Sequence, residues 1–229
     1  MQRKLIITGD GSHSVQVPEW QVSYHSIHGA IRESLHVYIE AGLKHWLHQH
    51  PTATDCFIFE MGFGTGLNAL LTMLEAQQPG QKITYESAEA YPLETTIIDA
   101  LNYCDALQRP DLKETFHLMH SSPWNIAVPV TANFTLKKVQ IDLLDYSTGQ
   151  PVDLIYYDAF APTAQPALWT TAVFQQLFNM LAPGGILVTY CSKGAVRRAM
   201  EAARFTVEKL PGPPGKREML RARRFHEKE

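Results

Sequence analysis

The sequence predicts an α/β protein built on a doubly wound, mostly parallel β-sheet. Short apolar runs alternate with segments whose apolar residues recur at helical spacing between residues 56 and 203. Most of these runs are apolar at consecutive positions, which is typical of strands covered on both faces by helices. With 229 residues, 45% of them hydrophobic, the chain is long enough to bury a substantial core.

An N-terminal extension precedes this alternating pattern. Residues 4–20 have the pattern of two short strands around a Gly-Asp-Gly turn. A stripe of apolar residues from Ile31 to Trp46 then predicts a helix, which Pro51 ends. We therefore expect residues 1–50 to form a hairpin and helix extension, and residues 51–229 to form the main domain of one compact unit.

The main domain is expected to contain seven strands and four helices. The strands are predicted at 56–62, 83–90, 135–146, 152–160, 185–191, 205–210 and 218–225, and the helices at 67–76, 92–107, 165–181 and 193–203. The glycines of Pro183-Gly184-Gly185 are expected to stop the third helix, and Ser192 to cap the fourth.

Two segments of the main domain depart from the alternation. The last two strands are joined by PGPPGKR, which is too short for a helical crossover, so one antiparallel strand is expected at that edge. Residues 108–135 fit a helix poorly and are interpreted as a connecting insertion.

Composition favours a cytoplasmic protein. No apolar run approaches the length that crosses a bilayer, and the N-terminus lacks a secretion signal, so no membrane partner is expected. The three cysteines are far apart and odd in number, as expected for reduced thiols.

The net charge of -3 conceals an asymmetry along the chain. Residues 1–192 carry 9 Lys and Arg against 18 Asp and Glu, whereas residues 193–229 carry 11 against 5. The basic C-terminal region is either an edge that faces a polyanion or an ordinary solvated surface.

The segment CFIFEMGFGTGLNALLTMLEA places three glycines between a strand and a helix. A dinucleotide-binding loop would need its third glycine at position 67, where Leu67 stands. The observed spacing, Gly62, Gly64 and Gly66, is the one used by proteins that bind S-adenosylmethionine on a similar sheet, because a side chain there would occupy the cofactor's space. Taken alone, such a loop is equally well explained as a packing turn.

Three acidic residues stand at the ends of successive predicted strands, as that cofactor requires. Glu60 ends the first strand, where it can meet an amino-acid ammonium group, and Glu89 ends the second, where it can accept hydrogen bonds from ribose hydroxyls. Asp142 ends the third strand, where it can accept a hydrogen bond from the adenine amine. Each acid singly is equally well a solvated loop residue, but their joint placement favours S-adenosylmethionine.

A fourth acidic residue points to the chemistry. Ligands of doubly wound sheets sit at the switch point between two neighbouring strands, which here end at Gly62 and Asp158. The motif YYDAFAP therefore puts Asp158 beside the transferred group and leaves Phe160 available to stack on a planar base. Their alternative roles are a turn aspartate and a core aromatic residue.

Several motifs resemble one family of methyltransferases. FEMGFGTGLNAL, SAEAYPL, DAFAPTAQPALWT, LAPGGILVTYCSKGAVRRAMEAARF and KREML are similar to the methyltransferase of 5-methylaminomethyl-2-thiouridine biosynthesis in bacterial tRNA. This enzyme is either the N-terminal half of bifunctional MnmC or the separate MnmD. The resemblance covers about residues 24–223.

The resemblance implies a Rossmann-like class I fold and an S-adenosylmethionine-dependent enzyme that methylates the 5-aminomethyl group of a wobble uridine. Gly62, Gly64, Gly66 and Glu89 match the family's cofactor-binding motifs, and Asp158 matches its active-site aspartate. Because the chain stops where the bifunctional form continues into its FAD-dependent half, we expect no FAD here, and a separate FAD-dependent oxidoreductase acting upstream.

The basic residues near the C-terminus are candidates for binding the tRNA anticodon loop. Those expected to contact phosphates are Lys193, Arg197, Arg198, Lys216, Arg217, Arg221, Arg223 and Arg224. Arg197 and Glu201 are equally well interpreted as an i,i+4 pair on a helix. The two His-x-x-His pairs, at 25/28 and 45/48, lack a third ligand at suitable spacing, so no metal is expected.

Two other functions stay open at this point. The same cofactor chemistry serves an N-methyltransferase that acts on a small-molecule or protein amine. A non-catalytic tRNA-binding module would have a glycine loop that only packs, and it would have no use for the four acids.

Overall fold

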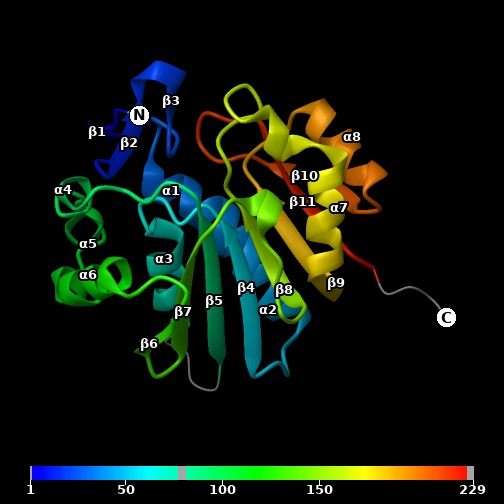
Figure 1. Cartoon of the computed structure of the whole chain (residues 1–229), viewed down its shortest axis with the longest axis horizontal. Coiled ribbons are helices and arrows are strands. Elements are labelled where there is room, and N and C mark those ends of the chain that lie inside the picture. The colour runs from blue at the N-terminus through cyan, green and yellow to red at the C-terminus, as the bar shows by residue number, and fades with distance from the viewer. Residues whose placement is uncertain (1, 77–80, 226–229) are drawn as a thin grey trace.

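The protein is built around one eight-stranded sheet with helices on both faces, and a small three-stranded sheet lies at one end of it (Figure 1). This computed structural model describes residues 2–76 and 81–225. The large sheet has the order β10-β11-β9-β8-β4-β5-β7-β6, and β4, β5, β7, β8 and β9 run parallel to their neighbours within that group. The predicted doubly wound α/β fold is confirmed.

The strands have the following bounds. The small sheet contains β1 (Lys4–Ile7), β2 (His13–Val17) and β3 (Val22–Ser23). The large sheet contains β4 (Asp55–Met61), β5 (Lys82–Glu89), β6 (Ala127–Thr131), β7 (Phe134–Gln140), β8 (Val152–Tyr157), β9 (Leu181–Thr189), β10 (Thr206–Pro211) and β11 (Glu218–Arg223).

The helices alternate with these strands. The α-helices are α1 (Ala30–Ser34), α2 (His45–Gln49), α3 (Leu67–Glu75), α4 (Thr95–Ile98), α5 (Tyr103–Ala106), α6 (Lys113–Ser121), α7 (Thr171–Met180) and α8 (Gly194–Ala202). Four short 3-10 turns are η1 (Pro18–Trp20), η3 (Pro110–Leu112), η4 (Leu143–Asp145) and η5 (Pro166–Trp169), and η2 (Leu35–Lys44) is a π-helix.

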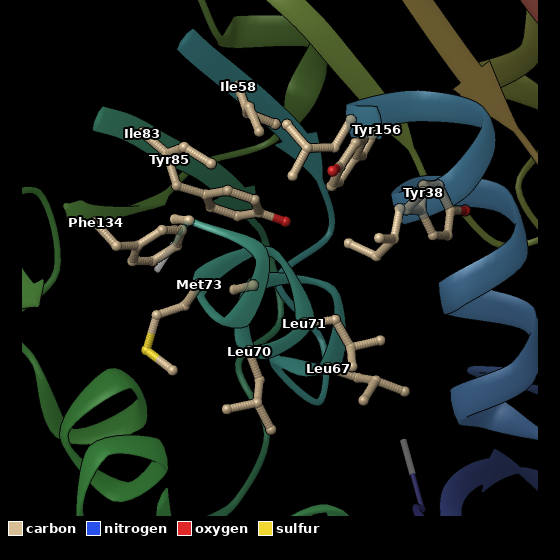
Figure 2. Close-up of a cluster of buried hydrophobic side chains, with 14 of the residues drawn as sticks. Tyr38, Ile58, Leu67, Leu70, Leu71, Met73, Ile83, Tyr85, Phe134 and Tyr156 are labelled. Atoms are coloured by element: carbon tan, nitrogen blue, oxygen red, sulfur yellow. The ribbon is translucent and has the colours of Figure 1, made fainter. Parts of the chain in front are cut away.

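The core has two layers because the apolar strands alternate their side chains between the two faces of the sheet. One layer packs α3 and the long N-terminal helix against the sheet, and the other packs α7 and α8 against the opposite face. Figure 2 shows the first layer, in which α3 lies beside Ile58 of β4, Tyr85 of β5 and Tyr156 of β8. Tyr38 of η2 lies in the same layer and is 1% exposed.

The predicted helix over residues 31–46 is confirmed, but its centre is a π-helix. α1, η2 and α2 form one continuous helix over residues 30–49. Its contact with the sheet is close at Gly42, where an added Cβ would lie 3.1 Å from Val188 Cγ2 and 3.2 Å from Tyr156 Cε1. Apolar spacing does not distinguish a π-turn from an α-turn over so short a stretch, which is why the sequence did not show it.

The edges of the large sheet differ from the prediction on one side. β11 is antiparallel to both β9 and β10, as expected for the closing hairpin. At the other edge, residues 108–135 contain η3, α6 and the antiparallel strand β6, so their interpretation as a connecting insertion was wrong. Within α6 only Phe116 and Met119 are buried, which left too weak a stripe for a helix prediction.

Other local expectations also need correction. The single helix predicted over 92–107 is divided into α4 and α5, because the Asn102 side chain between them accepts a hydrogen bond from the His13 backbone and donates one to the carbonyl of Gly11. The third predicted helix ends at Met180, before the Pro-Gly-Gly segment, which belongs to β9. Lys193, and not Ser192, is the N-cap of α8, and no side chain caps that helix.

Hydrogen bonds and an ion pair attach the N-terminal extension to the main domain. Arg3 donates hydrogen bonds to the carbonyl groups of Tyr91 and Pro92, in the loop after β5. On the other side, Lys216, in the loop between β10 and β11, forms an ion pair with Glu33 of α1. The N-terminal extension is therefore tied across the end of the large sheet where its parallel strands finish (Figure 1).

Candidate active site

A cleft opens where the parallel strands β4, β5 and β8 end and the N-terminal extension crosses above them. The space between its walls measures about 700 Å³ when the open solvent at its mouth is included. Its lining residues are Trp20, Tyr24, His25, Met61, Gly62, Phe63, Gly64, Thr65, Leu67, Asn68, Ala88, Glu89, Ala90, Tyr91, Asp158, Ala159, Phe160 and Gln165.

The register of the sheet brings the glycine loop and Asp158 together. β4 and β8 are parallel neighbours with Met61 opposite Tyr157, so Gly62 and Asp158 follow at the same level. The added Cβ of Gly62 would have the Asp158 carbonyl oxygen as its neighbour at 3.7 Å. The two residues predicted to flank the switch point therefore do so.

Gly64 and Gly66 are required for different reasons. Both have positive φ, +50° and +73°, which side chains rarely adopt. A Cβ at Gly64 would lie 3.1 Å from the Tyr24 ring, across the cleft, whereas one at Gly66 would lie 2.8 Å from His120 Nε2. Gly64 thus keeps the cleft open under Tyr24, and Gly66 allows α6 to pack on the loop outside it.

The three strand-end acids lie at different depths. Glu89 lines the cleft and accepts hydrogen bonds from the backbone N–H of Gly64 at 3.0 Å and of Tyr91 at 2.7 Å. Glu60 is buried below the cleft, where it accepts from Ser87 Oγ at 2.9 Å. Asp142 is exposed, accepts from the Leu144 backbone N–H, and is not among the lining residues.

Asp158 is held by two side-chain donors. Tyr38 Oη donates to its Oδ1 at 2.5 Å, and Asn68 Nδ2 donates to its Oδ2 at 2.9 Å. Burial raises the pKa of Asp158 to about 7, although the Tyr38 and Asn68 hydrogen bonds act in the opposite direction. Asp158 therefore changes its charge near neutral pH.

Asn68 links Asp158 to the second buried acid. Its Nδ2 also donates to Glu60 Oε1 at 3.0 Å, so one amide group bridges both carboxylates. Burial, and then the nearby charge of Asp158, raise the pKa of Glu60 to about 8. The Asn68 Oδ1 is buried without a hydrogen-bond partner among the described residues, which leaves an acceptor available beside the two acids.

Aromatic side chains form the upper wall of the cleft. The Phe160 ring meets the rings of Tyr24 and Trp20 edge to face, with centroids 4.9 Å and 5.8 Å away. Its backbone is fixed as well, because the N–H donates to Gln165 and the carbonyl accepts from Trp169 Nε1. Phe160 lies in the cleft as predicted, but it packs against two rings of the N-terminal extension, and stacking of a base on it stays a prediction.

Comparison with known proteins bears directly on this arrangement. Residues 111–224 match the sequence profile of a family described as S-adenosyl-L-methionine-dependent methyltransferase. That profile covers β8, β9 and the Asp158 loop. The chain is a methyltransferase of this family.

The related sequences are bifunctional proteins. The chain is 32% identical over 203 residues to a protein of Chromobacterium violaceum named tRNA 5-methylaminomethyl-2-thiouridine biosynthesis bifunctional protein MnmC. It is 30% identical over 210 residues to the protein of the same name from Pseudomonas entomophila. The alignments cover 85% and 86% of this chain but only 31% of each relative, so the chain spans about a third of their length.

Solved structures share the fold of the methyltransferase. MnmC2 from Aquifex aeolicus superimposes with a TM-score of 0.76 at 23% identity, over 97% of this chain and 70% of that one. Spermidine synthase from Thermotoga maritima superimposes with a TM-score of 0.55 at 14% identity, over 96% of this chain and 67% of that one. Both likenesses establish the fold.

The cleft of the methyltransferase fits S-adenosylmethionine. The glycine loop exposes backbone under Tyr24, and Glu89 presents a carboxylate to the same space. The unpaired Asn68 Oδ1, between two acids, suits a positively charged amino group. Of the predicted cofactor residues, Gly62, Gly64 and Glu89 line the cleft, while Glu60, Gly66 and Asp142 do not.

The predicted phosphate-binding residues divide into exposed and engaged groups. Lys193, Arg198 and Arg217 are exposed and form no ion pair with the described part of the chain. Arg197 pairs with Glu201 at 3.5 Å, as the alternative interpretation expected. Lys216 is paired with Glu33, and its Nζ lies 3.9 Å from the centroid of the Tyr190 ring, so its assignment to phosphates stays a prediction.

Three arginines in and directly after the last strand have structural roles. Arg221 pairs with Glu208 at 2.5 Å and is 8% exposed. Arg223 lies opposite Ile186 of β9, and its side chain contacts His45 Nε2 at 2.5 Å and Glu208 Oε1 at 3.7 Å. Arg224 donates to the Leu181 carbonyl at 2.6 Å. Their charges are used inside the protein, contrary to the expectation that they face phosphates.

Sequence reasoning missed Tyr38, Asn68 and the cover residue Trp20 as parts of one site. Asn68 was detectable, since it follows the glycine loop by two residues in the first turn of α3. Tyr38 is 120 residues from Asp158, and no local pattern connects the two. Across residues 2–76 and 81–225 there is no cluster of three metal-ligating side chains, and no helix long and apolar enough to cross a membrane.

Proposed function

We propose that this methyltransferase acts on the 5-aminomethyl group of the wobble 2-thiouridine in tRNA and produces 5-methylaminomethyl-2-thiouridine. The observation that carries the proposal is Asp158, held by Tyr38 and Asn68 beside the glycine loop and open to a cleft with an aromatic mouth. The names of the MnmC relatives support tRNA as the substrate.

The cofactor would be held by the floor of the cleft. Gly62 and Gly64 present backbone, Glu89 presents a carboxylate suited to hydroxyl groups, and Asn68 presents its unpaired oxygen. Asp142 remains a candidate for binding the adenine amine. Because Asp142 does not line the cleft, the adenine would have to extend beyond the cleft to meet it. When bound, S-adenosylmethionine supplies an electrophilic methyl group on a positively charged sulfur.

Asp158 prepares the attacking amine. That amine must be uncharged, and if its pKa resembled that of lysine, neutralising it at pH 7 would cost roughly 4–5 kcal/mol. Each Asp158 oxygen accepts one hydrogen bond, from Tyr38 or from Asn68, and retains a lone pair. These lone pairs can accept hydrogen bonds from the amine and so orient its nitrogen toward the methyl group. With a pKa of about 7, the carboxylate is also basic enough to accept the proton that the methylated amine loses.

The partners follow from this substrate. Lys193, Arg198 and Arg217 are exposed near the end of β9 and form no ion pair within the described residues, so they would be available to phosphates of the anticodon arm. The aminomethyl group has to be generated beforehand, by an FAD-dependent oxidoreductase acting on the tRNA. We propose that the reaction needs neither FAD nor a metal, and we expect it to take place in the cytoplasm, where its tRNA substrate is found.

The test is methyl transfer to tRNA that carries the 5-aminomethyl group. The protein is incubated with S-adenosylmethionine labelled in its methyl group, and the tRNA is digested to nucleosides. We expect label in 5-methylaminomethyl-2-thiouridine and none when free amines of similar size replace the tRNA. Transfer to the free amines alone would assign the enzyme to small-molecule substrates.

Asp158→Ala serves as the matched variant. It should lower the rate of transfer at least 100-fold and leave the affinity for S-adenosylhomocysteine, measured by calorimetry, within about threefold. Equal losses of rate and of cofactor affinity would instead assign Asp158 to cofactor binding.

A further inference from the structure

Two aromatic side chains at the mouth of the cleft are exposed to solvent. Trp20 is 40% exposed and Tyr91 is 59% exposed, and both line the cleft. The Trp20 indole N–H and the Tyr91 hydroxyl have no hydrogen-bond partner among residues 2–76 and 81–225. Both side chains are therefore accessible to a ligand that enters the mouth of the cleft, and each combines an apolar ring with a polar tip.

The backbone under each ring is held in place. η1 begins with Pro18 and closes at Gln21, which has a left-handed φ of 53° and donates to the Pro18 carbonyl, so Trp20 projects from a tight turn. The Tyr91 N–H donates to Glu89 and its carbonyl accepts from Arg3 Nη2 at 2.5 Å. Both side chains thus stand on fixed supports, which lowers the entropic cost of binding against them.

The charge around the mouth indicates the kind of partner. Tyr91 follows β5, on one side of the cleft, and the exposed Lys193, Arg198 and Arg217 follow β9 and precede β11, on the other. Tyr190, at the end of β9, connects that side to the cleft through a hydrogen bond to the Ala159 carbonyl at 2.9 Å. Aromatic faces at the mouth of the cleft, together with exposed cations that form no ion pair within residues 2–76 and 81–225, are the combination that binds unstacked single-stranded nucleic acid.

We propose that Trp20 and Tyr91 form a stacking platform for a nucleobase of a single-stranded RNA loop while the cations of the opposite side hold the adjacent phosphates. The inference rests on the proposed function for its substrate class, RNA, and adds the two residues that contact the base. A nucleobase can also come from the cofactor's adenine, so the test compares RNA with S-adenosylhomocysteine.

The experiment measures binding to the full-length chain at equilibrium. The probes are an unmodified anticodon stem-loop RNA, followed by fluorescence anisotropy, and S-adenosylhomocysteine, followed by calorimetry. Trp20→Ala and Tyr91→Ala are each expected to weaken RNA binding by at least about fivefold, as loss of one base-stacking contact does, and to change the affinity for S-adenosylhomocysteine less than twofold. Trp20→Phe should retain most of the RNA affinity.

Two further variants separate stacking from other effects. Phe225→Ala removes an aromatic side chain that is 60% exposed at the far edge of the sheet, and it should leave RNA binding unchanged. Arg198→Ala should flatten the dependence of RNA affinity on salt, whereas Trp20→Ala should shift the affinity without altering that dependence.

Unchanged RNA affinity in both alanine variants would overturn the inference, as would absence of RNA binding by the unmutated protein. A loss of S-adenosylhomocysteine affinity equal to the loss for RNA would assign the rings to adenine and would also overturn it. The RNA-binding assay does not depend on methyl transfer. If the two rings contribute to RNA binding but the protein does not methylate aminomethyl-tRNA, only the proposed function is disproved.

Discussion

At the scale of single residues, the chemistry of the site depends on how Asp158 is solvated. Burial raises its pKa, while hydrogen bonds from Tyr38 and Asn68 stabilise the carboxylate and partly compensate. Because the resulting pKa is about 7, small changes among these groups alter the fraction of enzyme that carries the charged, proton-accepting form.

Replacing Tyr38 by phenylalanine should displace the pH dependence of methyl transfer. Loss of a hydrogen bond to a charged group, about 1.5–3 kcal/mol, raises the pKa of Asp158 by one unit or more. The unmutated enzyme should gain activity as pH rises through about 7, since the carboxylate is the active form. In Tyr38→Phe the midpoint should move upward, with roughly fivefold less activity at pH 7 and near-normal activity above pH 9.

The control is Tyr103→Phe, which removes a buried hydroxyl that has no hydrogen-bond partner among the described residues. Its pH profile should coincide with that of the unmutated enzyme. A Tyr38→Phe profile that falls equally at every pH would show that Tyr38 supports the fold without tuning Asp158.

Glu60 should make the folded protein less stable as pH rises. Its pKa is about 8 in the folded state and near 4.5 when unfolded, so between pH 5 and pH 8 the folded protein retains a proton that the unfolded chain has lost. The free energy of unfolding therefore falls across this window, by about 3–4 kcal/mol from Glu60 alone.

Glu60→Gln tests this directly, because glutamine does not ionise. Urea unfolding at pH 5, 6.5 and 8 should give a shallower decline for the variant than for the unmutated protein, with the remaining slope coming from Asp158. Parallel slopes for the two proteins would mean that Glu60 is ionised in the folded state.

At the scale of elements, the turn between β4 and α3 sets the depth of the cleft. Glycine is required at position 64 for two reasons: its φ is positive, and an added side chain would contact the Tyr24 ring. Only a continuous strand, turn and helix can deliver this geometry, which explains why the pattern was recognisable in the sequence.

Gly64→Ala is expected to destabilise the protein by about 1–2 kcal/mol through its positive φ. The new Cβ, 3.1 Å from Tyr24, should also push the cover away and weaken S-adenosylhomocysteine binding at least tenfold. Thermal unfolding and calorimetry measure the two effects. Gly149→Ala, where no atom lies within 4 Å of the added Cβ, should alter neither, and equal behaviour of the two variants would contradict the prediction.

Elements whose identity depends on distant contacts were predicted less well. Residues 92–107 have the composition of one helix, yet Asn102 and His13 hold the segment in two pieces through hydrogen bonds across 89 residues of chain. β6 pairs only with β7 and occupies an edge, where a strand needs little apolar sequence. Residue propensities for helix and strand contain no information about long-range hydrogen bonds or about the position of a strand in a sheet.

At the scale of the whole molecule, the N-terminal extension completes the site. It supplies Trp20, Tyr24 and His25 to a cleft whose floor is made by β4, β5 and β8. The ion pair between Glu33, which is 5% exposed, and Lys216 connects this cover to the loop before β11. The cover of the cleft is thus held in place by contacts between opposite ends of the chain.

Lys216→Met should destabilise the protein by about 2–4 kcal/mol, because it leaves the buried Glu33 carboxylate without its cation. Urea unfolding provides the measurement. The double variant Glu33→Gln/Lys216→Met should recover much of the loss, since no buried charge remains unpaired. Identical stability of the single variant and the unmutated protein would show that solvent screens this pair.

The sequence by itself determined the doubly wound sheet, the glycine loop, the acids at the strand ends and the placement of Asp158 beside Gly62. All of these depend on short-range patterns: apolar runs, helical spacing and glycines in one turn. Only the tertiary structure decided that Tyr38 and Asn68 hold Asp158, that Trp20 lies over the cleft, and that Lys216 faces Glu33. These partners are up to 183 positions apart, and their contacts arise only when the chain closes on itself.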